Sequence, residues 1–247
     1  MSALDALRAA RTRYDVAALL GYKPSALSFI VYRIPVTAKH TTFEIKKKGG
    51  GVRRIDAPIP KVKGLQKKLA DVLYECQREI EASEKRKNKT SHAFREDCSI
   101  ITNAKAHRSR RYVLNLDLQN FFPSLHFGRI RGFFLNNNYL KLAEPVATVL
   151  AQIACNDGVL PQGSPCSPIL SELLTHFLDI RLAKLCSGLE LRPSRRNAPK
   201  SRALRARTRW RSGWLKLWPL FVRRQGVKRP RPRPKARETH SYAEEDP

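Results

Sequence analysis

The sequence predicts an α/β chain that ends in a long basic segment without regular structure. Residues 42–55 alternate polar and apolar side chains on either side of three glycines, which predicts a β-hairpin. Residues 112–116 form an apolar, β-branched run of strand length that ends at Asp117. Apolar residues recur with the period of a helix in three further segments: 63–80, 139–155 and 168–185.

The N-terminal part, residues 1–38, is predicted to be a helical lead. Residues 3–20 place Leu and Val among Ala and Arg, which indicates one or two short amphipathic helices ending near Gly21. Residues 26–33 are compatible with another helix. The charged run 81–89 then follows the first long predicted helix as a solvated extension or loop.

Charge indicates a polyanionic partner. The formal net charge is +27, a sign and size typical of proteins that bind nucleic acid. Residues 191–237 hold 18 Lys or Arg and no acid, and residues 238–247 hold four acids. Few folded domains tolerate such a run, so we treat residues 186–247 as a separate low-complexity tail.

The cysteines and the lengths of the apolar runs predict the cellular compartment and the absence of membrane contact. Five widely spaced cysteines without a CxxC pair predict reduced thiols in a cytoplasmic protein. No apolar run approaches the length of a membrane span, and residues 1–5 lack the apolar core of a signal peptide. We therefore expect no membrane partner.

The segment around Asp117 carries the first chemical signal. A nucleotidyl polymerase needs carboxylates on rigid strands to hold two Mg²⁺ ions, and Asp117 ends a predicted strand. An Asp that only caps the next turn would give the same pattern. The second signal is the loop 160–168, whose small residues and prolines lead into the helix at Pro168. Gly163 permits close backbone approach to a ligand, although a plain connector would look similar.

Taken together, these segments resemble motifs of reverse transcriptases. Residues 43–58 resemble the fingers motif, NLDLQNFFPSL (115–125) resembles motif A, and LPQGSPCSPILSEL (160–173) resembles motif B, in the family's order and spacing. The NAxxH element at 103–107 is similar to that of retron enzymes. Residues 91–94 (SHAF) resemble their HGF element, with Ala in place of Gly.

The resemblance implies a role for individual residues. Asp117 matches the first metal-binding aspartate, and the backbone carbonyl of Leu118 would be a further Mg²⁺ ligand. The remaining matches concern the incoming dNTP and RNA. The positions implied to bind the nucleotide are Lys46, Lys47, Arg53, Phe122 and Gln162, and those implied to bind RNA are Asn103 and His107.

Among the nucleotide positions, Phe122 would exclude a ribose 2′-hydroxyl and Gln162 would lie beside the nucleotide. The triphosphate would be held by Lys46 or Lys47 together with Arg53. The lysine would act as a point charge and the arginine as a bidentate fork. His107 has a competing interpretation as a satisfied structural group.

One departure from the family is large. The family places a Tyr-x-Asp-Asp hairpin about 20 residues after the motif B helix, whereas this chain has no aspartate between Asp179 and Asp246. The thumb and the VTG element of retron enzymes are also missing. The tail is compatible with a basic arm that stacks Trp210, Trp214 and Trp218 on bases, with an amphipathic helix for a membrane or partner, or with a segment read out of frame. We favour the third.

The resemblance implies a right-hand polymerase with fingers and a partial palm over residues 39–185, and RNA-directed DNA synthesis from a structured noncoding RNA. In retron systems the RNA–DNA product works with an effector protein in antiphage defence. Two alternatives remain open: a non-catalytic RNA-binding protein, and a fragment similar to group II intron maturases, which the NAxxH element disfavours.

Overall fold

A computed structural model describes residues 2–46, 51–84, 90–92, 98–109, 113, 118, 121–187 and 192–195. All of these except Leu118 belong to one compact unit of the chain. Most of the predicted strand 112–116, Asp117 and the tail beyond residue 195 lie outside the described residues.

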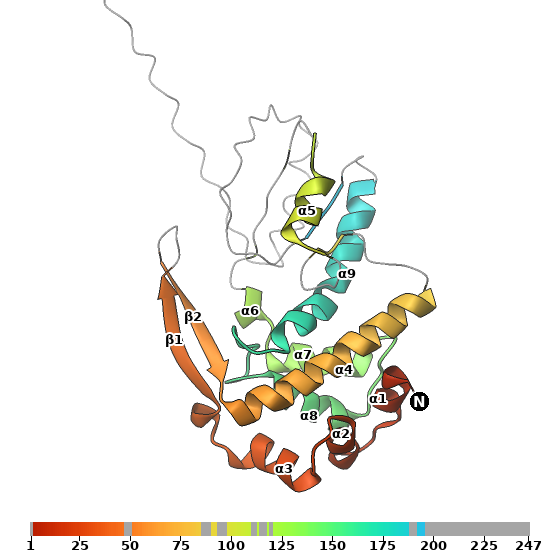
Figure 1. Cartoon of the computed structure of the whole chain (residues 1–247). Coiled ribbons are helices and arrows are strands. Elements are labelled where there is room, and N and C mark those ends of the chain that lie inside the picture. Colours follow the sequence, from red (N-terminus) through yellow and green to blue (C-terminus); the bar gives the residue numbers. More distant parts are fainter. Residues whose placement is uncertain are drawn as a thin grey trace, which may run out of the picture. The chain divides into compact units, whose positions relative to one another are not determined.

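The predicted hairpin is confirmed. Strand β1 (His40–Lys46) pairs antiparallel with β2 (Val52–Pro58), in a register that places His40 opposite Pro58 and Lys46 opposite Val52. Gly51, at φ +80°, takes a left-handed conformation that glycine adopts without steric cost. Figure 1 shows this hairpin as an orange ribbon beside the helices. It forms the only sheet among the described residues. The α/β prediction is therefore confirmed in part: the described residues form a mostly helical body with one small sheet.

The N-terminal lead is helical, as predicted. Helix α1 (Ala3–Ala9) begins after an N-cap at Ser2, and α2 (Arg13–Leu19) begins with a capping box between Thr12 and Asp15. These caps satisfy backbone N–H groups that the first helical turn leaves unpaired. Short turns lead on to the hairpin: α3 (Pro24–Ser28), a π-helical turn η1 (Phe29–Arg33) and a 3₁₀ turn η2 (Val36–Ala38).

The long helix α4 (Pro60–Glu84) packs against α1, α8 and α9. It begins earlier than the apolar pattern predicts, and it continues into the charged run as far as Glu84. Its apolar stripe is fully buried at Leu65, Leu69 and Leu73, and each such side chain contributes about 1.5–3 kcal/mol of stabilisation.

The rest of the body consists of helices from the second half of the chain. They are α5 (Ile100–Ala106), α6 (Phe121–Ser124), α7 (Phe127–Asn136), α8 (Glu144–Ala154) and α9 (Ser167–Ser187). Helix α8 begins five residues later than its apolar pattern, because Pro145 occupies its first turn and Lys141 has a positive φ. Helix α9 matches the predicted helix at 168–185. None of the described helices is long and apolar enough to cross a membrane.

Candidate nucleotide site and the α5–α9 site

The loop that precedes α9 is held rigidly by buried hydrogen bonds. The Ser164 hydroxyl donates to Gln66 Oε1 over 2.7 Å, and Gln66 Nε2 donates to the carbonyl of Ile153 over 3.0 Å. Ser167 Oγ donates to the carbonyl of Pro161 over 2.7 Å. Because Gln66 is fully buried, each of these groups would be costly to leave unpaired. The loop therefore has a defined conformation before any ligand binds.

The same loop is bonded to the hairpin. The backbone N–H of Asp56 donates to the carbonyl of Gln162 over 2.7 Å. The next residue, Gly163, has φ +123°, and a Cβ built there would lie 3.0 Å from both the Asp56 carbonyl oxygen and Ile55 Cγ2. Glycine is thus required at this position by both backbone conformation and space. Within the chain the group that approaches Gly163 closely is strand β2, and the close approach to a ligand expected from the sequence stays a prediction.

Two of the predicted cations lie on this hairpin. Lys46 is exposed at the end of β1. Arg53 is half-buried on β2 and is paired with Ile45 of β1 in the strand register. Lys47 lies outside the described residues. On the same strand, Asp56 Oδ1 accepts hydrogen bonds from Thr42 Oγ1 at 2.7 Å and from Arg54 Nε at 3.0 Å. Arg53 therefore lies on the strand that is bonded to the loop carrying Gln162, whereas Lys46 lies at the far end of the hairpin.

Phe122 lies in α6 and packs at the edge of the hydrophobic core. Its ring makes an edge-to-face contact with the ring of Phe121, with 5.4 Å between the ring centroids. Its carbonyl accepts from the N–H of Leu125, and the Leu125 carbonyl accepts from the N–H of Leu160. Phe122 is thus tied to the start of the loop that holds Gln162. Leu118 belongs to the other unit, and Asp117 lies outside the described residues, so their assigned roles stay predictions.

Asn103 and His107 lie elsewhere, on and just after α5, and both contact Ser194. Asn103 Nδ2 donates to Ser194 Oγ over 3.0 Å, and His107 Nε2 forms a short hydrogen bond with the same oxygen. The structure therefore brings the NAxxH element to a segment that follows α9. Their assignment to RNA stays a prediction.

A buried ionic cluster that the sequence did not reveal lies beside Ser194. Arg195 donates from Nε and Nη2 to the two carboxylate oxygens of Asp179, at 2.6 and 2.8 Å, and also pairs with Glu172. Ser91 accepts from Arg195 and donates to Glu172. Burial would lower the pKa of Arg195, but hydrogen bonds and the charges of Asp179 and Glu172 outweigh it and raise that pKa.

Arg195 gives no sequence signal because it stands within a run of basic residues. Glu172 and Asp179 do give one, since two acids seven residues apart share a face of the apolar helix α9 and need a buried cationic partner. We call Asn103, His107, Glu172 and Asp179 the α5–α9 site. Among the described residues, no three His, Cys, Asp or Glu side chains converge to hold a metal ion.

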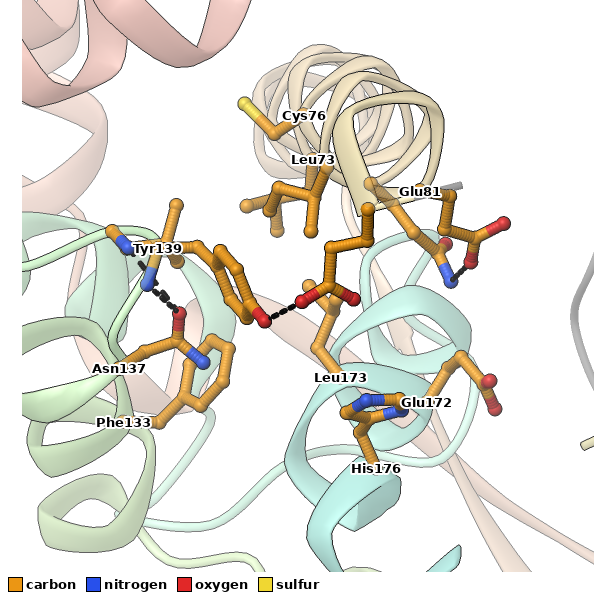
Figure 2. Close-up of a pocket in the computed structure, with 13 residues that line it drawn as sticks. Leu73, Cys76, Glu81, Phe133, Asn137, Tyr139, Glu172, Leu173 and His176 are labelled. Carbon is orange, nitrogen blue, oxygen red and sulfur yellow. Dashed lines mark hydrogen bonds between the residues drawn. The ribbon is translucent and has the colours of Figure 1, made fainter. Parts of the chain in front are cut away.

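Figure 2 shows a small pocket between α4, α7 and α9. Leu73 and Phe133 give it apolar walls, and Tyr139 donates a hydrogen bond to Glu84 at its rim. Glu172 also lines the pocket, whereas none of the described residues predicted to bind nucleotide does. The pocket is therefore separate from the hairpin and the loop ahead of α9.

Residues 45–191 match the family model described as reverse transcriptase (RNA-dependent DNA polymerase). The chain belongs to the reverse transcriptase family. The match covers the end of β1, all of β2, the loop and α9, so the resemblance derived from the motifs is confirmed.

The curated relatives are retron enzymes. The chain is 34% identical to the retron Mx65 reverse transcriptase of Myxococcus xanthus over 195 residues, which cover 71% of this chain and 43% of the relative. It is 39% identical to the retron Ec86 reverse transcriptase of Escherichia coli over 89 residues, which cover 36% of this chain and 27% of the relative. The retron resemblance is confirmed, and the chain spans less than half the length of these two relatives.

Proposed function

We propose that this chain is the fingers and front palm of a retron-type RNA-directed DNA polymerase. In an intact enzyme of this type the template would be a structured noncoding RNA, the substrates dNTPs, and the product an RNA–DNA molecule that acts with an effector protein in antiphage defence. We place it in the cytoplasm, because all five cysteines are free thiols. Family membership supports the reaction class, and the retron relatives support the kind of template.

In this proposal the hairpin and the loop ahead of α9 form the two walls of a dNTP site. Arg53, with Lys46 or Lys47, binds the triphosphate, and Gln162 lies beside the nucleotide. Phe122 restricts the space at the sugar. The observation that supports this arrangement most directly is the hydrogen bond from Asp56 to Gln162, which joins the two walls.

The family typically uses a divalent metal. Mg²⁺ would be held by Asp117 and the Leu118 carbonyl, and when bound it would polarise the reacting phosphate. The chain offers no second aspartate in the expected region, since none occurs between Asp179 and Asp246. We therefore propose that it binds nucleotide and RNA but does not extend a primer. The out-of-frame explanation of the tail would then apply beyond Arg195, because Ser194 and Arg195 pack specifically against the body.

Equilibrium binding of a fluorescent dNTP to the full-length chain tests this site. Arg53→Ala removes a charge-assisted contact to phosphate and should weaken binding by about tenfold or more. Lys68→Ala is the control, because it removes one positive charge from an exposed position on α4, outside the proposed site. Equal losses in the two variants would indicate nonspecific attraction and would refute the proposed site.

A non-catalytic RNA-binding protein is the second candidate, favoured by the missing aspartates and the net charge of +27. A dedicated RNA binder should keep a preference for one RNA at moderate salt. A polymerase that lacks the second aspartate should bind a hairpin RNA and an unrelated RNA with similar affinity. Each phosphate contact should add about 0.7 to 0.9 to the slope of log K against log salt. A salt series with both RNAs separates the two. The maturase-like alternative gains no support from the retron relatives.

A further inference from the structure

Residues 192–195 are anchored to the body through their backbone. The N–H of Arg195 donates to the carbonyl of Thr90 over 2.7 Å, and the carbonyl of Arg195 accepts from the N–H of His92 over 2.9 Å. These bonds form a parallel bridge between Arg195 and Ser91. Thr90 and Ser91 are both buried, and so is Arg195, so the segment enters the body at its last described residue.

The second anchor is the guanidinium of Arg195. Only 9% of this side chain is exposed, and its carboxylate partners Glu172 and Asp179 are 2% and 1% exposed. Buried carboxylates without a partner are strongly unfavourable. The paired Nε and Nη2 contacts to Asp179 have the fork geometry that a lysine cannot reproduce. The site therefore selects an arginine.

The third anchor is the hydroxyl of Ser194. A hydroxyl has one hydrogen and two lone pairs, so Ser194 can accept from Asn103 and donate to His107 at the same time. Helix α5 is in turn tied to the segment at 90–92, since Thr102 Oγ1 lies 3.0 Å from His92 Nδ1. Both polar side chains of the NAxxH element thus face a serine of the same chain.

We propose that the α5–α9 site is a docking site for the Ser-Arg pair at 194 and 195. Ser194 and Arg195 are positioning residues that fix the chain after α9. In this view Asn103 and His107 bind the hydroxyl of Ser194 in the protein's own chain instead of RNA. The inference rests on these contacts and not on the proposed polymerase function.

Hydrogen–deuterium exchange on the full-length chain tests the docking site. The reporters are the amides of Arg195 and His92, whose hydrogen bonds exist only while the segment is docked. Arg195→Ala should raise their exchange rates by about tenfold or more. Arg192→Ala is the matched control, because Arg192 is exposed and belongs to the same segment, and it should leave both rates unchanged.

Guanidinium rescue adds a readout that general destabilisation would not give. Millimolar guanidinium should restore protection of the His92 amide in Arg195→Ala, and sodium chloride at the same ionic strength should not. If Arg195→Ala fails to fold, Ser194→Ala provides the test, since it removes one hydroxyl. It should speed exchange at Arg195 several-fold while the amides of α8 keep their rates. Unchanged exchange at Arg195 in the variant that folds, or equal loss in Arg192→Ala, would overturn the proposal.

Discussion

The backbone N–H of Asp56 donates to the carbonyl oxygen of Gln162 across 2.7 Å. This bond joins strand β2 to the loop that precedes α9, and Gly163 lies against the same strand. The two segments are more than 100 residues apart in the chain. Their junction is the structural basis of the proposed nucleotide site, and it can be tested without any ligand.

Gly163→Ala should destabilise the fold by about 1–3 kcal/mol, because a Cβ is strained at this φ and would meet strand β2. Urea unfolding measures the change. Gly132→Ala is the control: Gly132 lies within α7 with nothing within 4 Å of an added Cβ, and the substitution should stabilise by about 0.5–1 kcal/mol. A neutral Gly163→Ala would contradict the close approach.

Gln66→Leu should cost about 1–3 kcal/mol, because it removes the donor to the Ile153 carbonyl and the amide acceptor of the Ser164 hydroxyl, which keeps only its weaker contact with Cys166 Sγ. The variant should also weaken dNTP binding if the loop's conformation matters for the site. Its neighbour Lys67 is exposed, and Lys67→Ala should change stability by no more than about 0.5 kcal/mol. Comparable losses in both variants would argue against a special role for Gln66.

Stability should fall on mild acidification because of His40. Burial lowers the pKa of His40, with the charge of Lys39 acting in the same direction and that of Asp56 opposing it. The unfolded chain therefore binds more protons below pH about 6.5, and stability is lost as the pH falls through that value. Thermal unfolding between pH about 7.5 and about 5.5 measures the loss. His40→Asn should show a smaller dependence on pH, and an unchanged dependence would exclude His40 as the source.

The buried thiols should resist alkylation. Burial raises the pKa of Cys76 and of Cys166 to about 12, so almost no thiolate is available to react at neutral pH. Mass spectrometry after brief treatment with iodoacetamide should find Cys98 modified well before these two residues, since Cys98 is only half-buried. Modification of Cys166 at the same rate as Cys98 would show that the core around α9 opens readily.

Sequence patterns predicted the strands and helices whose formation depends on local interactions. The glycine-flanked alternation predicts β1 and β2, and the apolar period predicts α4 and α9, because strand and helix faces repeat at fixed spacing. The motifs also indicate that the backbone at Gly163 can be approached closely, although the predicted neighbour is a ligand. They do not identify β2 as the neighbour, since that contact joins segments far apart in the chain.

Composition did not predict the positions of residues that are held by single specific contacts. The change in composition after residue 185 places Ser194 and Arg195 in the tail, although both pack into the body. An average over many basic residues carries no information on which one meets two buried carboxylates. The acids on α9 hold that information, because a buried acid requires a partner. The remainder of the tail lies outside the described residues, and its lack of structure stays a prediction.

Primer extension shows whether this chain synthesises DNA. Full-length chain is incubated with Mg²⁺, dNTPs and a primed RNA template, beside an intact retron reverse transcriptase as positive control, and the same preparation is shown to bind dNTP. We expect nucleotide binding without extension, because one aspartate cannot position two metal ions. Template-dependent extension that is abolished by Asp117→Ala would contradict it.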